Sequence, residues 1–359
     1  MAVNACASVQ RIGPATQERA WRTYLGTDWR APATFDSVNP DPQPVWRIDV
    51  GRGVAGAPAL TEDLVAVAQV DRQVALLDRA TGDVIWRHRV PNPPGPGPLV
   101  DGDRVYVATQ EDRGRVHALQ LATGAEVWSA VVGDVAAPLA MDDSTLYAAT
   151  TTGHVSAIAT ANAVRRWRVQ LTGAVRVTPL LTPAGIVIAT TGDSVFLLSR
   201  TTGAVRIRRA VRGSVLAAPA WADSTVLLAT SAGELMALRP DSLTTRWRLD
   251  VGGGVVGTVA VLQRTVYALT DRGVLWRVPL DDPTAAGRVE TGVIARAGPA
   301  PTASGVFLGG VNGALALLDP ATGERRWSVR LQPPLQQPVV VDGRCFIAVS
   351  ARGEVVAFR

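Results

Sequence analysis

Residues 77–86 read LDRATGDVIW, and the same ten-residue pattern returns at residues 318–327 as LDPATGERRW. The tryptophan that ends this pattern, or a residue in its place, recurs along the chain at intervals of 39 to 42 residues. A period of this length is typical of propellers, solenoids and other repeat arrays. The anchor positions are Trp46, Trp86, Trp128, Trp167, Trp247 and Trp327, with Ile207 and Gly287 in the two copies that lack tryptophan.

A proline keeps the same period as the tryptophan, which makes a chance repeat improbable. It stands at Pro58, Pro98, Pro138, Pro179, Pro219, Pro299 and Pro338, and Val259 replaces it in the sixth copy.

Each repeat unit contains short runs of Val, Leu, Ile and Ala that are bounded by turn residues, and such runs predict strands. The first unit has four of them, at residues 54–60, 64–70, 73–80 and 83–90. No stretch has a helical period, so the sequence predicts an all-β chain with four strands per unit. Glycine marks two of the turns, where a positive φ is expected: Gly114, Gly153, Gly192, Gly233, Gly273, Gly313 and Gly353 between the second and third strands, and Gly82, Gly124, Gly203 and Gly323 between the third and fourth.

The number of strands predicts how the ring closes. The first three strands of the unit occur eight times, but the last copy stops at Arg359 without a fourth strand. Residues 45–51, VWRIDVG, have the fourth-strand sequence and precede the first complete unit. We therefore expect an eight-bladed β-propeller of four-stranded antiparallel blades, closed by an N-terminal outer strand that covers an otherwise unpaired edge. The domain prediction is a leader or tether at residues 1–44 and a propeller at residues 45–359.

The charge of the chain comes from arginine alone, because none of its 36 basic residues is lysine, and the formal net charge is +5. Arginine follows the anchor position in six of the eight units, as in Arg47 and Arg248. On an outer strand these charges would protect the exposed edge from pairing with other chains. A basic belt for nucleic acid or anionic lipid is the alternative, but dense basic runs and RNA-binding aromatic motifs are absent from the sequence. We therefore expect no nucleic-acid partner.

The leader contains the sequence Val3-Asn4-Ala5-Cys6, which resembles the end of a bacterial lipoprotein signal, although Asn4 departs from that pattern. Cys6 is therefore the candidate lipidation site, and its signal peptide would be absent or truncated in this sequence. The alternatives are an accidental cysteine and a disulfide with Cys345, which is otherwise expected to pack as a small buried side chain. Two cysteines this far apart form no metal or redox motif.

The prolines, the LD-x-x-TG-x-x-x-W turn and the period of about forty together resemble the repeat of pyrroloquinoline-quinone-type (PQQ-like) propellers. The leader sequence at residues 21–30, WRTYLGTDWR, is also similar to a stretch that often precedes such propellers. The resemblance implies one of two functions. Quinoprotein dehydrogenases hold the quinone and a calcium ion on the propeller axis, and BamB-like lipoproteins are eight-bladed scaffolds that assist the assembly of outer-membrane β-barrel proteins.

The inner strands of this chain are a poor match to the quinoprotein site. That site uses Glu, Asn and Asp ligands and usually a vicinal cysteine pair, which this sequence lacks. Calcium prefers six to eight oxygen ligands, whereas the polar residues expected near the axis are Arg176, Arg296, Gln336 and Gln337. We therefore expect no cofactor, no metal and no enzymatic activity, and we keep a PQQ-dependent dehydrogenase as the weakest alternative.

The remaining polar residues form no recognisable catalytic set. His88, His117 and His154 occupy unmatched positions of the repeat, so neither a metal triad nor a proton relay is predicted. The leading hypothesis is a non-catalytic, BamB-like scaffold of the periplasm, anchored to outer-membrane lipid if Cys6 is acylated. Its partner would be the periplasmic region of the β-barrel assembly machinery. A periplasmic ligand-binding or sensory propeller, with Arg176 and Arg296 holding an anion in the channel, is the second hypothesis.

Overall fold

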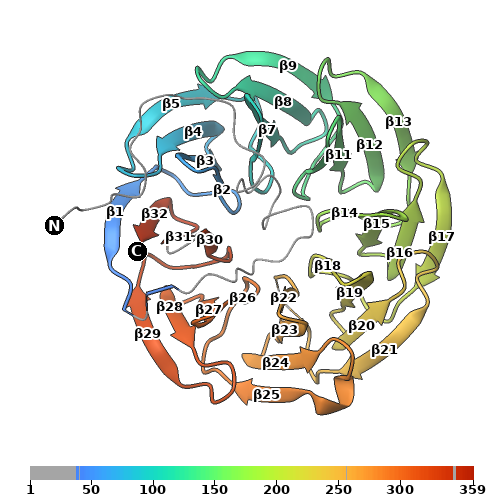
Figure 1. Cartoon of the computed structure of the whole chain (residues 1–359). Helices are drawn as coiled ribbons and strands as arrows, with labels where there is room; N and C mark the ends of the chain where they lie inside the picture. The colour runs from blue at the N-terminus through green and yellow to red at the C-terminus, as the bar shows by residue number, and fades with distance from the viewer. Residues whose placement is uncertain (1–37, 40, 256, 343–344) are drawn as a thin grey trace.

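The structure is a computed structural model that describes residues 38–39, 41–255, 257–342 and 345–359. Eight four-stranded sheets stand around a common centre as the blades of a propeller (Figure 1). Within each sheet the neighbouring strands pair antiparallel, as in the order β2-β3-β4-β5 of blade 1. This confirms the predicted fold class and the number of blades.

The strands follow the chain from the centre outward in every blade. The innermost strands are β2 (Ala59–Leu60), β6 (Leu99–Asp101), β10 (Ala140–Asp142), β14 (Leu180–Thr182), β18 (Ala220–Ala222), β22 (Ala260–Leu262), β26 (Ala300–Thr302) and β30 (Val340–Asp342). The second strands are β3 (Leu64–Gln69), β7 (Arg104–Ala108), β11 (Thr145–Ala149), β15 (Gly185–Thr190), β19 (Thr225–Ala229), β23 (Thr265–Leu269), β27 (Gly305–Gly309) and β31 (Cys345–Val349).

The third strands are β4 (Gln73–Asp78), β8 (Arg115–Gln120), β12 (His154–Ala159), β16 (Ser194–Leu198), β20 (Glu234–Leu238), β24 (Val274–Pro279), β28 (Ala314–Leu318) and β32 (Glu354–Phe358). The outer strands are β5 (Val84–Arg89), β9 (Glu126–Val131), β13 (Arg165–Gln170), β17 (Val205–Ala210), β21 (Thr245–Asp250), β25 (Gly287–Glu290), β29 (Arg325–Arg330) and β1 (Pro44–Asp49).

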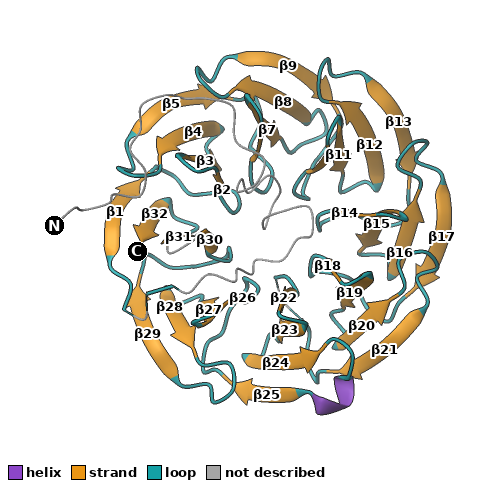
Figure 2. Cartoon of the chain, in the orientation of Figure 1, coloured by secondary structure: helices purple, strands orange, loops and turns teal. Residues whose placement is uncertain are grey.

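Among the described residues, turns and loops connect these strands, apart from one short 3-10 helix, η1 (Pro283–Ala285), between β24 and β25 (Figure 2). The Asp282 side chain caps this helix by accepting a hydrogen bond from the Thr284 backbone N–H. In the described part of the chain, no helix has the length and apolar character that spanning a membrane requires.

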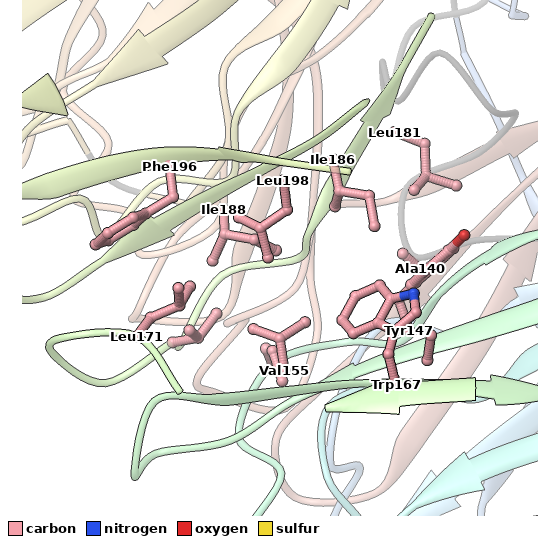
Figure 3. Close-up of a cluster of buried hydrophobic side chains, with 14 residues drawn as sticks. Ala140, Tyr147, Val155, Trp167, Leu171, Leu181, Ile186, Ile188, Phe196 and Leu198 are labelled. Atoms are coloured by element: carbon pink, nitrogen blue, oxygen red, sulfur yellow. The ribbon is translucent and has the colours of Figure 1, made fainter. Parts of the chain in front are cut away.

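The core consists of apolar layers between neighbouring blades. Middle strands such as β3 and β15 are buried along their whole length because a blade covers each of their two faces. Figure 3 shows one layer between blades 3 and 4, where Tyr147 and Trp167 lie against Ile186. Outer strands such as β21 instead alternate exposed and partly buried residues.

The anchor tryptophans join each blade to the next one. The indole N–H of Trp86, on β5 of blade 1, donates to the backbone carbonyl of Leu121 in blade 2 at 2.8 Å. Four further anchors make the same bond with their following blade, at 2.7 to 2.9 Å: Trp46, Trp128, Trp167 and Trp247. The indole of Trp327 lies instead in an aromatic cluster with Phe307, Phe346 and Phe358.

The Thr-Gly turn accepts the indole because glycine has no side chain. Gly124 has a φ of +72°, and a Cβ atom built on it would lie 2.7 Å from the Trp86 ring. Glycine at this turn therefore provides both the left-handed backbone and the space for the ring. Between the second and third strands, the expected positive φ is found at five of the seven glycines. It is absent from Gly114 and Gly192 in the structure, and at Gly114 a Cβ would instead collide with the carbonyl of Gly133 at 2.3 Å.

The two ends of the described chain complete blade 8, as the strand count predicts. Strand β1 pairs with β32 in the sheet order β1-β32-β31-β30, and Gln43 and Arg359 exchange two backbone hydrogen bonds. The Trp46 indole then donates to the Arg79 carbonyl of blade 1 at 2.7 Å. The Arg79 guanidinium forms a 2.6 Å ion pair with Asp342 of blade 8. The domain boundary at residues 44–45 stays a prediction, although Val38 already packs between blades 7 and 8.

Candidate functional site

At one end of the ring, the same backbone hydrogen bond recurs in all eight blades. The turn between the second and third strands donates a backbone N–H to the connection that enters the innermost strand of the same blade, at 2.8 to 3.0 Å. We call this end, made of those turns and connections, the connection face. The donor and acceptor pairs are Val70 and Gly53, Gln110 and Pro93, Thr151 and Asp134, Thr191 and Ala174, Ser231 and Ser214, Asp271 and Gly254, Val311 and Ile294, and Ala351 and Pro334.

The polar residues predicted to lie near the axis all belong to this face. Arg176, Arg296 and Gln336 are exposed, and Gln337 is partly exposed. They lie in the connections that precede β14, β26 and β30, in blades 4, 7 and 8. The fold thus brings them to one end of the molecule, while their role as channel-lining residues stays a prediction.

Apolar side chains are exposed on the same face. Leu216 is 51% exposed in the connection that precedes β18, and Ile294 is 54% exposed in the connection that precedes β26. Val70, in a turn of blade 1, is 47% exposed. Exposed apolar residues beside arginine are a combination common in protein-binding surfaces.

Two cavities occupy equivalent places between neighbouring blades, near the outer strands. The first has a volume of about 580 Å³ and lies between blades 4 and 5. Its charged lining residues are Arg209, Arg212, Arg248, Glu234 and Asp250. The second, of about 310 Å³, lies between blades 6 and 7, where the small Ala314 and Ser328 leave space.

Blade 2 contains a hydrogen-bonded histidine–carboxylate pair that the sequence did not predict, between the buried His117 and the exposed Glu126. His117 is 1% exposed, and its Nδ1 lies 2.6 Å from Glu126 Oε2. Burial lowers the pKa of His117, although the hydrogen bond to Glu126 opposes this effect. The pKa of Glu126 is also lowered, against the effect of its own burial, by hydrogen bonds from His117 and Ser129.

The repeat position of Ser129 explains why this pair forms here. The residue that follows the anchor is arginine in most blades. It lies opposite an apolar residue of the third strand in all of those blades except blade 3, where Arg168 lies opposite Ser156. Thus Arg208 lies over Phe196, with 5.7 Å between the guanidinium carbon and the ring centroid. Blade 2 has Ser129 opposite His117 instead. This exchange could be found in the sequence only once the register of the two strands is known.

The two other histidines and the cysteines give no site. His88 and His154 are partly exposed and lie on β5 and β12 of different blades. Cys345 is only partly buried, at the start of β31, and its thiol is not free. The proposed lipidation residue Cys6 lies outside the described residues. Among the residues that the structure describes, no group of three or more His, Cys, Asp or Glu side chains could hold a metal ion.

Comparison with known proteins assigns the family. A family model described as outer membrane protein assembly factor BamB matches residues 6–129, 112–205, 182–273 and 257–359. The chain belongs to this family. The four matched segments overlap and include all eight blades, so membership in the BamB family does not depend on one local motif.

Individual relatives are distant. BamB of Burkholderia pseudomallei is 28% identical over 144 residues, which cover 35% of this chain and 38% of that protein. The crystal structure of BamB from Moraxella catarrhalis superposes with a TM-score of 0.74 and 16% identity, covering 89% of this chain and 99% of that one. Quinohemoprotein alcohol dehydrogenase from Comamonas testosteroni gives a TM-score of 0.80 and 14% identity, covering 96% of this chain and 81% of that one. At these identities the two structures share the fold with this chain, which does not fix its activity.

Proposed function

We propose that this protein is a non-catalytic scaffold of the bacterial cell envelope that assists the assembly of outer-membrane β-barrel proteins. The observation that carries the proposal is the match of all eight blades to the BamB family model. A closed ring suits a scaffold because its core is shared between neighbouring blades, which keeps the surface turns in fixed relative positions.

The connection face is the docking surface in this proposal. It exposes Leu216 and Ile294 together with Arg176 and Arg296. Apolar side chains and arginine contribute strongly to protein binding when a partner removes them from water. The partner we propose is the periplasmic part of the β-barrel assembly machinery.

A pull-down from native envelope with the tagged full-length chain tests the proposal. We expect recovery of barrel-assembly proteins, and a loss of that recovery in the double variant Leu216→Glu with Ile294→Glu. Val205→Glu is the matched control, because Val205 is also exposed, at 43%, but lies on the outer strand β17. Equal recovery by the double variant would refute docking on the connection face, and recovery of a cytosolic complex would refute the scaffold role and the compartment.

The proposed membrane anchor is a lipid on Cys6. It rests on the resemblance of residues 3–6 to the end of a lipoprotein signal, and it requires that Cys6 is not engaged with Cys345. Mass spectrometry of the protein from native membranes, without reducing agent, distinguishes the two states. A diacylglyceryl mass on the Cys6 peptide supports the anchor, whereas a Cys6–Cys345 disulfide or an unmodified Cys6 refutes it.

The similarity to quinohemoprotein alcohol dehydrogenase makes a quinone-dependent enzyme the alternative to test. Adding pyrroloquinoline quinone and calcium to the purified chain and measuring dye-linked alcohol oxidation provides that test. Turnover above the protein-free control would replace the scaffold proposal with the enzymatic one.

The second alternative is a ligand-binding or sensory propeller, in which the exposed Arg176 and Arg296 bind a small anion. Such a site would raise the melting temperature when a small anion binds. Phosphate, sulfate and citrate are suitable probes. A rise that disappears in the variant Arg176→Ala with Arg296→Ala would support an anion site, and an unchanged melting temperature would count against it.

A further inference from the structure

Strand β9 differs from all the other outer strands of the ring in its charge. Its sequence, EVWSAV, contains no arginine, whereas each of the other seven outer strands contains at least one. Arginine on an exposed edge prevents pairing with foreign strands. The edge of blade 2 therefore has no arginine of its own, unlike the outer strands of the other seven blades.

The backbone of β9 has groups directed away from its own sheet. Directly after β9, the N–H of Val132 donates to the carbonyl of Gly114. Directly before β9, the carbonyl of Ala125 accepts a hydrogen bond from the N–H of Gln120. Hydrogen bonding alternates along an antiparallel pair, so Trp128 and Ala130 bond to β8 while Ser129 and Val131 direct their N–H and C=O groups outward.

Hydrogen bonds from two arginines of other strands confirm that the carbonyls of Ser129 and Val131 point away from β8. Arg165 of β13 donates to the Val131 carbonyl at 2.9 Å. Arg115 of β8 donates to the Ser129 carbonyl at 3.2 Å. The carbonyls of this edge are therefore covered by guanidinium groups that belong to neighbouring strands.

The side chains of β9 leave an apolar outer surface. Val127 and Val131 are each 46% exposed. The single charge of the strand, on Glu126, is held by the 2.6 Å contact with His117 and by a 3.0 Å hydrogen bond from the Ser129 hydroxyl. These bonds fix the backbone of β9 and leave its valines available to a partner.

The apolar surface continues along the rim. Val164, directly before β13, is 55% exposed, and Val205, at the start of β17, is 43% exposed. Thus blades 2, 3 and 4 each expose valine at the outer strand or directly before it. In blades 3 and 4, however, arginines lie on the same strands.

We propose that β9 is a docking edge for an extended segment that alternates apolar side chains with acidic ones. The apolar residues would pack on Val127 and Val131. The carboxylates would take the guanidinium groups of Arg115 and Arg165 away from the carbonyls of β9, and this exchange frees those carbonyls for strand pairing. The charge of these two arginines is what selects an acidic segment over a basic one. The source we commit to, a strand of an unfolded outer-membrane barrel protein, rests on the proposed function.

A labelled peptide tests the edge directly with the full-length chain. The probe is a decapeptide that alternates valine with threonine and glutamate, and its affinity is measured by fluorescence anisotropy. Val131→Arg replaces an apolar contact by the kind of charged side chain that the other edges have. We expect it to weaken binding about tenfold or more, because the peptide valines lose their contact with Val131 and a long charged side chain on the edge hinders strand pairing. Val205→Arg, which adds the same charge to β17, should bind within about twofold of the unchanged protein.

Three further measurements keep the result interpretable. Circular dichroism and the melting temperature establish that Val131→Arg is folded, and Val131→Thr offers a milder variant that should retain binding. A peptide with a central proline cannot complete the pairing and should not bind. A peptide with lysine in place of glutamate should bind more weakly, because it cannot engage Arg115 and Arg165. Equal binding by Val131→Arg, or equal binding of the proline peptide, would overturn the proposal.

A second probe separates this inference from the proposed function. A urea-unfolded outer-membrane barrel protein is diluted into the chain carrying a photocrosslinking residue at Val131 or, as control, at Val205. Crosslinking at position 131 alone supports the proposed source, and its absence overturns that source even where the peptide binds. Peptide binding at β9 without recovery of barrel-assembly proteins from the envelope would refute the proposed function and leave the docking edge in place.

Discussion

Replacing Trp46 by alanine tests whether the N-terminal outer strand locks the ring. The Trp46 indole lies on the Gly82 turn, where a Cβ atom built on the glycine would be only 2.8 Å from the ring. Its N–H donates to the backbone carbonyl of Arg79 at 2.7 Å. The change removes both of these contacts, while the Arg79–Asp342 ion pair between blades 1 and 8 remains. It leaves the pairing of β1 with β32 in place.

The expected loss follows from these two contacts. The hydrogen bond contributes about 1 kcal/mol. Removal of a fully buried tryptophan side chain costs about 3 to 5 kcal/mol, but Trp46 is only partly buried, so we expect a total of about 2 to 3 kcal/mol. With an unfolding entropy of about 2.1 cal/mol/K per residue over the 359 residues, the melting temperature should fall by about 3 °C.

Urea denaturation and hydrogen exchange measure the effect, with Trp247→Ala as the matched control. Trp247 makes the same 2.7 Å bond to the following blade, but the chain connects its two blades covalently. Both variants should lose similar stability, and only Trp46→Ala should increase exchange in β1 and β32. Unchanged exchange in those strands, or an unchanged melting temperature, would refute the idea that Trp46 closes the ring.

Three more predictions concern closure, pH and the turns. Deleting residues 45–51 should lower the stability of the whole ring, since blade 8 then lacks its outer strand, and an unchanged melting temperature would contradict this. Burial lowers the pKa of His117 below its ordinary 6.5, so the folded protein holds this imidazole in its neutral form. The stability that the neutral imidazole contributes is therefore fully present above pH 6.5 and is lost as the pH falls below it. Urea unfolding between pH 7.5 and 5.5, where Glu126 stays ionised, should show a smaller decline for His117→Gln than for the unchanged protein, and equal slopes would exclude His117 as the cause. Gly203→Ala should destabilise the protein more than Gly292→Ala. Both glycines have positive φ, but a Cβ at Gly203 would meet Trp167 at 2.5 Å whereas nothing lies within 4 Å of Gly292; equal melting temperatures would show that the indole contact is unimportant.

The sequence was sufficient for the architecture because the features that build a propeller are periodic. The tryptophan and proline positions gave the number of blades, and the missing fourth strand after Glu354–Phe358 gave the closure. Individual turns were less predictable. Gly114 and Gly192 keep ordinary φ values because glycine serves close packing as well as backbone freedom, and the sequence does not distinguish the two.

The candidate surfaces were only partly predictable. Arg176 and Arg296 could be placed in the connections because the repeat fixes their position, but the direction of a long side chain depends on its neighbours. The His117–Glu126 pair was missed because its cause is a departure from the repeat at Ser129, in a different strand. The lack of arginine in β9 can be read from its sequence, EVWSAV. It stands out only when β9 is compared with the seven other outer strands, each of which contains arginine.

Because β1 pairs with β32, blade 8 can be completed only at the end of synthesis. During synthesis β1 emerges first, and its partner appears only when almost the entire polypeptide has left the ribosome. Until then the early strand has no partner strand in its own sheet, and the seven completed blades cannot close into a ring. A chain that stops short of β32 would therefore remain open and more accessible to proteases, so the pairing of β1 with β32 distinguishes full-length from truncated molecules.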